Sequence, residues 1–151
     1  MNLINRSILP LMISRMRQDR ILAVTGARQS GKTTLCERQL PENVQQAHAY
    51  INFDDPEERL RFQRSPLAVL ESLDAPLVIL DEVQKIPSLF DPLKVVADDN
   101  ARKDRKQTFI LTGSSQLLLV KSIRETTLQR SGIMYGPCRT GISSDSILLP
   151  P

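Results

Sequence analysis

The chain has 151 residues, of which 40% are hydrophobic and 25% are charged, and its formal net charge is +3. This length suits one domain and leaves little room for a large second one. Aromatic residues make up only 4% and tryptophan is absent, which argues against a stacking platform for single-stranded nucleic acid, while a pI near 9.1 still permits nucleic-acid contact.

Cysteine usage and the apolar segments bear on the compartment. Cys36 and Cys138 are the only cysteines and lack metal-ligand spacing, which fits a reducing compartment. The apolar run at residues 8–13 is too short to cross a bilayer, and the arginines that follow it are not typical of a signal peptide. We therefore expect a cytoplasmic protein without a membrane partner.

Apolar runs and amphipathic segments alternate along the chain. Apolar residues at helical spacing predict a first helix over residues 3–18, although Pro10 disfavours its middle. Further on, short apolar runs closed by turn residues predict strands, and the alternation of apolar and polar residues at 49–53 predicts another. Longer segments predict helices. Strands that alternate with helices imply an α/β fold, in which a parallel sheet lies between two helical layers. The predicted strands are 21–24, 49–53, 77–80 and 108–111; the predicted helices are 32–40, ended by Pro41, then 56–63, 66–73, 89–100 and 116–123.

The segment between the first strand and the second helix matches a phosphate-binding motif. Residues 26–33 fit the pattern G-x-x-x-x-G-K-[ST] in full. Glycines allow the tight turn that brings backbone N–H groups to phosphate oxygens, Lys32 can reach the β- and γ-phosphates, and the Thr33 hydroxyl can bind Mg²⁺. An ordinary glycine turn is the alternative, but the strand before and the helix after favour ATP binding with Mg²⁺. The predicted nucleotide contacts are Gly26, Ala27, Arg28, Gln29, Ser30, Gly31, Lys32, Thr33 and Thr34.

Two acidic residues follow the predicted strand 77–80. Ligands of parallel α/β sheets lie at the carboxyl ends of the strands, so Asp81 and Glu82 should reach the phosphate edge. Asp81 is the expected partner of the Mg²⁺ shell, and Glu82 could orient or deprotonate the attacking water. A solvated strand end is the alternative for an acidic pair alone. The preceding phosphate-binding motif favours the catalytic interpretation.

Hydroxyl groups close the strand 108–111. Thr112 and Ser114 could contact the γ-phosphate or the attacking water, or a serine here could cap the next helix. Both roles are compatible.

Several basic residues and the one histidine have weaker assignments. Arg124 and Arg130 could neutralise transition-state charge in a neighbouring subunit, or they could be solvated. The basic run at residues 102–106 favours a solvated loop over nucleic-acid contact. His48 is expected to be structural or exposed.

Four segments together resemble a known family. They are Val24–Leu35, Tyr50–Pro56, Leu80–Pro87 and Phe109–Ser115. This combination is similar to the prokaryotic AAA+-type ATPases, which commonly carry a C-terminal domain of unknown function after the ATPase core. The resemblance covers roughly residues 4–124. It implies Walker A, Walker B and sensor-1 roles for the positions given above, with ATP hydrolysis in full-length members.

Beyond Glu125 the sequence departs from the family pattern. Arg130 is the candidate for the family's arginine position, and residues 133–135 are the candidate for a fifth strand. We expect an ATPase core over residues 1–135, a poorly ordered tail over residues 136–151, and no helical lid. We expect this chain to bind ATP, to be a monomer or a weak oligomer, and to hydrolyse ATP at a rate near the uncatalysed background. The alternatives are a nucleotide-binding module without turnover and an ATPase stimulated by nucleic acid.

Overall fold

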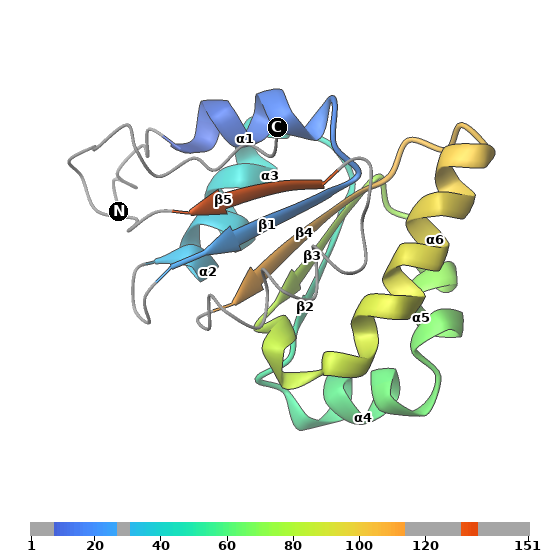
Figure 1. Ribbon diagram of the computed structural model, residues 1–151. Coiled ribbons are helices and arrows are strands. Elements are labelled where there is room, and N and C mark those ends of the chain that lie inside the picture. The colour runs from blue at the N-terminus through green and yellow to red at the C-terminus, as the bar shows by residue number, and fades with distance from the viewer. Residues whose placement is uncertain (1–7, 27–30, 114–130, 136–151) are drawn as a thin grey trace.

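A parallel sheet forms the centre of the computed structural model (Figure 1), which describes residues 8–26, 31–113 and the backbone of 131–135. Its strand order is β2-β3-β4-β1-β5, and every neighbouring pair is parallel. The carboxyl ends of the strands therefore meet at one edge of the sheet. The strands are β1 (Ile21–Thr25), β2 (His48–Asn52), β3 (Leu77–Asp81), β4 (Thr108–Gly113) and β5 (Ser131–Tyr135).

Helices cover both faces of this sheet (Figure 1). One face carries α1 (Ile8–Met16) and a continuous helical stretch made of α2 (Lys32–Thr34), the π-helical turn η1 (Leu35–Gln39) and α3 (Leu40–Val44). The other face carries α4 (Pro56–Arg64), α5 (Pro66–Ser72) and α6 (Phe90–Arg102). Two short 3₁₀ turns, η2 (Val83–Lys85) and η3 (Pro87–Leu89), lie between β3 and α6. The predicted three-layer α/β fold is confirmed.

The strands β1, β3 and β4 are almost continuously apolar because both of their faces are buried. Successive side chains of a strand point to opposite faces, so Leu22 packs toward α1 and η1 while Ala23 packs toward α6. Two separate apolar clusters result, one in each interface between the sheet and a helical layer. Their fully buried large members include Met12, Leu22, Leu35, Leu40 and Ile79 on the first face and Phe53, Phe62, Leu70, Leu80 and Phe109 on the second.

The second helix does not end at Pro41 as predicted. It continues to Val44, because the π-helical turn η1 precedes the proline. The backbone N–H of Leu40 donates to the carbonyl of Leu35, five residues back. A proline lacks an N–H and normally clashes with the carbonyl four residues earlier. The wider turn moves that carbonyl out of register, and Pro41 then takes an early position in α3 where its missing donor costs little.

Other boundaries differ by small amounts. The described part of the first helix ends at Met16, two residues before the predicted end, and residues 3–7 of that prediction lie outside the described residues. The fifth strand begins at Ser131 rather than residue 133. The predicted helix 116–123 and the predicted tail 136–151 also lie outside the described residues. Among the helices that the structure describes, none is long and apolar enough to cross a membrane.

Candidate nucleotide-binding site

The predicted phosphate-binding segment leaves β1 at the carboxyl edge of the sheet. Gly26 follows the strand and is buried, and Gly31 begins the turn into α2. Gly31 has φ 79° and ψ 24°, the left-handed conformation that glycine adopts without steric cost. Residues 27–30, which include the predicted contacts Ala27, Arg28, Gln29 and Ser30, lie outside the described residues.

The Lys32 side chain turns back over this segment. Its Nζ donates a hydrogen bond of 2.9 Å to the carbonyl oxygen of Gly26, and the residue is only 5% exposed. The ammonium group is thereby held at the carboxyl end of β1, beside the amino terminus of α2. A cation in this place can meet an anion that approaches the same edge.

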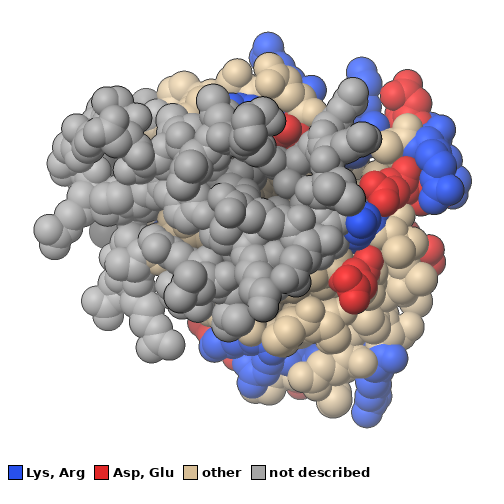
Figure 2. Space-filling model, in the orientation of Figure 1, with Lys and Arg blue, Asp and Glu red and all other residues tan. Residues whose placement is uncertain are grey.

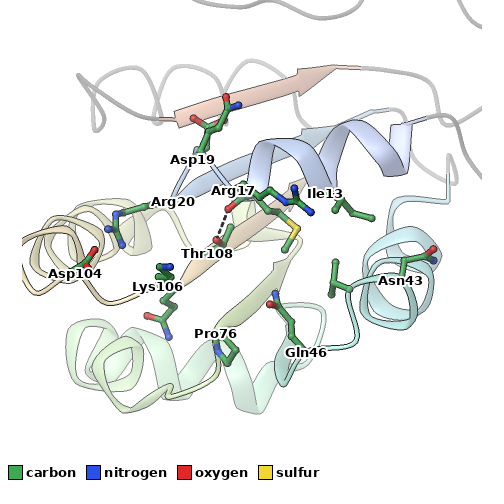
Figure 3. Close-up of a pocket in the computed structure, with 14 residues that line it drawn as sticks. Ile13, Arg17, Asp19, Arg20, Asn43, Gln46, Pro76, Asp104, Lys106 and Thr108 are labelled. Carbon is green, nitrogen blue, oxygen red and sulfur yellow. Dashed lines mark hydrogen bonds between the residues drawn. The ribbon is translucent and has the colours of Figure 1, made fainter.

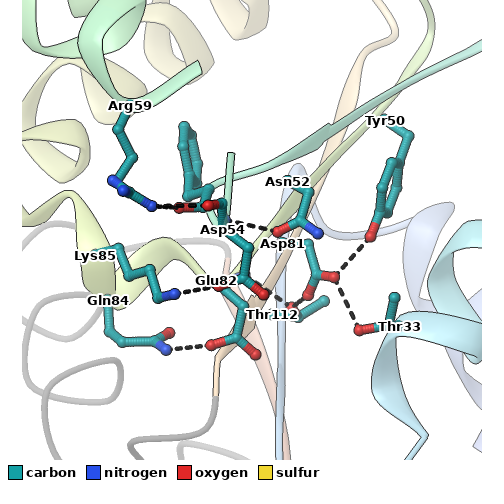
Figure 4. A network of polar contacts seen from close by, with 11 residues as sticks. Thr33, Tyr50, Asn52, Asp54, Arg59, Asp81, Glu82, Gln84, Lys85 and Thr112 are labelled. Atoms are coloured by element: carbon teal, nitrogen blue, oxygen red, sulfur yellow. Dashed lines mark hydrogen bonds and ion pairs between the residues drawn. The ribbon is translucent and has the colours of Figure 1, made fainter. Parts of the chain in front are cut away.

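The Asp81 carboxylate receives three hydroxyl groups from three different elements (Figure 4). Thr33 Oγ1, from α2, donates to Asp81 Oδ2 over 2.9 Å, and the Tyr50 hydroxyl, from β2, donates to the same oxygen over 2.6 Å. Thr112 Oγ1, from β4, donates to Asp81 Oδ1. Asp81 itself is 1% exposed. The buried carboxylate is thus satisfied by hydroxyl donors rather than by a cationic side chain in this network.

Strand register explains why these groups meet. Tyr50 is aligned with Ile79, and Asn52 is aligned with Asp81, so Tyr50 lies diagonally across from Asp81 on the same face. On the other side of β3, Leu80 is aligned with Leu111, which places Thr112 next to Asp81. Tyr50 had no predicted role. Its signals in the sequence were its place in a strand that precedes a turn at the same sheet edge and its place in the segment Tyr50–Pro56 that resembles the family.

The Tyr50 hydroxyl remains a hydrogen-bond donor at physiological pH. Burial, followed by the hydrogen bond to Asp81 and the charge of that carboxylate, raises the pKa of Tyr50 well above its ordinary value of 10.0. Because loss of its proton would place two negative charges together, the phenol stays neutral. It is therefore a permanent donor to Asp81.

Glu82 has a strained backbone. Its φ of 59° and ψ of 41° lie in the left-handed region, which is uncommon for a residue with a Cβ and costs about 1–3 kcal/mol. Its N–H donates to Thr112 Oγ1 over 3.2 Å, and its carboxylate accepts a hydrogen bond from Gln84 Nε2. In Figure 4 the Glu82 carboxylate faces the Gln84 side chain.

The β2 end supports this edge with its own contacts. Asn52 Oδ1 accepts from the Asp54 N–H over 2.8 Å, and Asp54 forms an ion pair with Lys85 of η2. Arg59 donates to the carbonyl oxygens of Phe53 and Asp54 over 2.7 and 2.9 Å. These contacts tie the β2–α4 connection to the turn that follows Glu82.

The structure brings together only part of the predicted site. Gly26, Gly31, Lys32, Thr33, Asp81, Glu82 and Thr112 share the carboxyl edge, with Thr34 next in α2. Ser114, Arg124 and Arg130 lie outside the described residues. His48 opens β2 at the opposite edge and is exposed, as expected.

The basic run before β4 is engaged with acidic neighbours. Lys103 pairs with Asp99 at 2.6 Å, and Arg105 pairs with Asp74 at 2.5 Å. In Figure 2, basic and acidic groups are interspersed over the described part of the face that is shown. The charges of Lys103 and Arg105 are thus partly balanced, which favours the solvated-loop interpretation of this run.

A pocket of about 650 Å³ lies at the other edge of the sheet, where the strands begin (Figure 3). Its walls come from the end of α1, the connection to β1, the α3–β2 connection and the residues before β3 and β4. It is remote from Lys32 and Asp81, since strands of five or six residues separate the two edges. Its lining includes Met16, Arg17, Asp19, Arg20, Lys106 and Thr108.

Asp19 at this pocket predicts a pH-dependent stability. Burial raises the pKa of Asp19 above its ordinary value of 3.8, although Arg15 at 3.7 Å opposes the shift. The folded state therefore holds the proton more tightly, and stability falls as pH rises from 3.8 through the raised pKa. We expect Asp19→Asn to raise the Tm at pH 7, because the variant buries no charge at this position.

The check is a series of melting curves for both proteins between pH 3.5 and 7. The difference in Tm should shrink toward zero at the acid end, where Asp19 is protonated and resembles asparagine. A difference that stayed constant over this range would show that the charge of Asp19 is not its cause.

The oxygen donors at the carboxyl edge suit a hard cation. Mg²⁺ binds through one or two carboxylates, hydroxyls, substrate phosphates and several waters. Asp81 and Thr33 provide a carboxylate and a hydroxyl whose oxygens are 2.9 Å apart. Among the described residues there is no group of three or more His, Cys, Asp or Glu side chains that could hold a metal by themselves.

The family follows from comparison with known sequences. The family model described as the AAA domain matches residues 18–136. The chain belongs to this AAA-domain family. This match confirms the predicted relation to AAA-type P-loop ATPases. No curated protein sequence shows significant similarity to the chain.

Solved structures share the fold of this AAA domain. One is described as the crystal structure of a DNA replication initiation factor, with a TM-score of 0.56 and 16% identity, and the match covers 89% of this chain and 47% of that one. Another is C. elegans PCH-2, with a TM-score of 0.54 and 14% identity, covering 85% of this chain and 41% of that one. At these identities the likeness shows the fold alone. The chain spans less than half the length of either protein.

Proposed function

We propose that this AAA domain binds ATP together with Mg²⁺ at the carboxyl edge of the sheet. The observation that carries the proposal is the junction of two segments 48 residues apart, in which Thr33 Oγ1 of the phosphate-binding motif donates to Asp81 Oδ2 at the end of β3. A chance glycine turn would have no reason to meet a buried carboxylate. The family match supports a nucleotide as the ligand.

Each group has a proposed part in binding. Backbone N–H groups between Gly26 and Thr34 surround the phosphates, and Lys32 neutralises their charge. Thr33 and Asp81 hold the cation, which supplies positive charge beside the phosphate oxygens. The Thr33 hydroxyl can donate to Asp81 while its oxygen lone pairs face the cation. The remaining predicted contacts are Ala27, Arg28, Gln29 and Ser30.

We further propose that this site hydrolyses ATP, as is expected of full-length members of the family. Glu82 would orient or deprotonate the attacking water, since a carboxylate in that place can serve as a general base. Thr112 fixes the backbone N–H of Glu82 and also donates to Asp81, so one hydroxyl links both acidic residues. Ser114 and Arg130 remain proposed partners of the γ-phosphate. The strained conformation of Glu82 supports a functional role, because strain of this kind clusters at functional sites.

Calorimetry tests the binding proposal. ATP should bind the purified chain with one-to-one stoichiometry, and Mg²⁺ should strengthen the binding. Absence of heat at millimolar ATP with Mg²⁺ would remove the proposed function.

The role of Asp81 gives a sharper test. Asp81→Asn keeps the size of the side chain and one of the two accepting oxygens, but it removes the charge beside the cation. We expect the gain in ATP affinity on adding Mg²⁺ to fall roughly tenfold, the effect of losing one charge-assisted contact. Affinity in EDTA should stay unchanged, because Lys32 and the backbone do not depend on Asp81.

The matched control is Asp98→Asn, which removes an exposed carboxylate from α6. It should bind ATP as the parent does with and without Mg²⁺. If Asp81→Asn kept the whole gain in ATP affinity on adding Mg²⁺, the cation would have to bind somewhere other than Asp81.

A further inference from the structure

The Asp81 carboxylate has few accepting positions left. An ionised carboxylate offers about four lone-pair sites, two on each oxygen. Thr33 and Tyr50 both donate to Oδ2, and Thr112 donates to Oδ1. Both positions on Oδ2 are therefore taken, and the open position belongs to Oδ1. Direct contact of both oxygens with one cation is incompatible with this arrangement.

Tyr50 is the least adaptable of the three donors. Its ring packs against the apolar cluster between the sheet and α1, and its strand is paired with β3 along the whole of β2. Threonine hydroxyls turn freely about one bond, whereas the phenol oxygen moves only with the ring. The Tyr50 hydroxyl, 2.6 Å from Oδ2, thus fixes the orientation of the carboxylate plane.

We propose that Tyr50 is a positioning residue that makes the site selective for Mg²⁺ over Ca²⁺. By occupying Oδ2, Tyr50 restricts Asp81 to contact through a bound water or through one oxygen. Mg²⁺ keeps several of its waters and demands a small octahedral shell, so this arrangement suits it. Ca²⁺ takes six to eight oxygen ligands and accepts bidentate carboxylates, so it gains from a carboxylate with free oxygens. The inference rests on the proposed binding of ATP with a divalent cation at this site.

The test compares the parent with Tyr50→Phe, which keeps the ring and its packing but removes the hydroxyl. The dissociation constant for ATP is measured by calorimetry with saturating Mg²⁺, with saturating Ca²⁺ and with EDTA. We expect the ratio of the dissociation constant with Ca²⁺ to the dissociation constant with Mg²⁺ to fall about threefold to tenfold in the variant. This is the size of effect that one hydrogen bond gives. The affinity for ATP in EDTA should match that of the parent, and a circular dichroism spectrum should show that the variant is folded.

Thr108→Val is the matched control, since it removes a hydroxyl of β4 that donates to the Met16 carbonyl at the opposite edge. It should leave the ratio unchanged. An unchanged ratio in Tyr50→Phe would overturn the inference while leaving the proposed function intact. Equal losses with both cations, or a loss in EDTA, would also overturn it, because they indicate a structural role. A parent that binds no ATP would instead overturn the proposed function, and this inference with it.

Discussion

Lys32→Ala is expected to lower the affinity for ATP by about 100-fold, the largest effect on binding among the variants considered. Lys32 is 5% exposed and is held by the Gly26 carbonyl at the site where the phosphates are proposed to lie. A charge-assisted hydrogen bond contributes about 1.5–3 kcal/mol, which is roughly tenfold to more than 100-fold in affinity. More than one phosphate oxygen lies within reach of an ammonium group with three donors, so the upper part of this range applies.

The measurement is calorimetric titration of ATP with Mg²⁺, supported by circular dichroism and melting curves to show that the variant is folded. Lys103→Ala is the matched control, because Lys103 is an exposed lysine directly after α6 whose partner is Asp99 of that helix. It should bind ATP as the parent does. Parental affinity in a folded Lys32→Ala variant would remove the phosphate-binding assignment.

Glu82→Gln should lower turnover by about 10²–10⁴-fold in any preparation of the chain that hydrolyses ATP, the range for loss of a general base. The glutamine has nearly the same shape and retains an oxygen that can accept the hydrogen bond from Gln84. The glutamine would adopt the same left-handed backbone conformation, so the backbone strain at this position is unchanged. Binding should therefore persist with an affinity close to that of the parent.

Single-turnover hydrolysis and ATP affinity are measured on the same samples. Glu71→Gln is the control, since it makes the same substitution at an exposed position of α5. Turnover equal to that of the parent in Glu82→Gln would exclude Glu82 as the base. Loss of binding in that variant would instead assign Glu82 a part in holding the nucleotide.

Much of the fold follows from local sequence signals. The four strands predicted before residue 113 are present, each within two residues at either end, because short apolar runs closed by Asp, Asn or Gly favour buried parallel strands. Helices α4 and α5 begin at the predicted residues, Pro56 and Pro66, because a proline in the first turn lacks only a donor that would be unpaired there. The helix through Pro41 is the exception. No local rule indicates that a π-helical turn will precede that proline, since the turn depends on how the helix packs against the sheet.

The sequence by itself determined which residue types lie in the proposed phosphate-binding segment and in the acidic pair. A glycine-rich turn between a strand and a helix is a local pattern, and so is a carboxylate at a strand end. Each pattern can be recognised in a short stretch of sequence without knowledge of the fold. The requirement for glycine at position 31 is equally local, because φ 79° disfavours any side chain with a Cβ.

Only the tertiary structure decided which groups meet Asp81. Tyr50 is 31 residues from it, Thr33 is 48 residues from it, and Thr112 follows it by 31. Their convergence depends on the strand order β2-β3-β4 and on the register within it, neither of which is encoded by the spacing of any motif. A parallel register aligns whole strands through backbone hydrogen bonds, so a hydroxyl such as that of Tyr50 acquires its partner only after distant segments have paired.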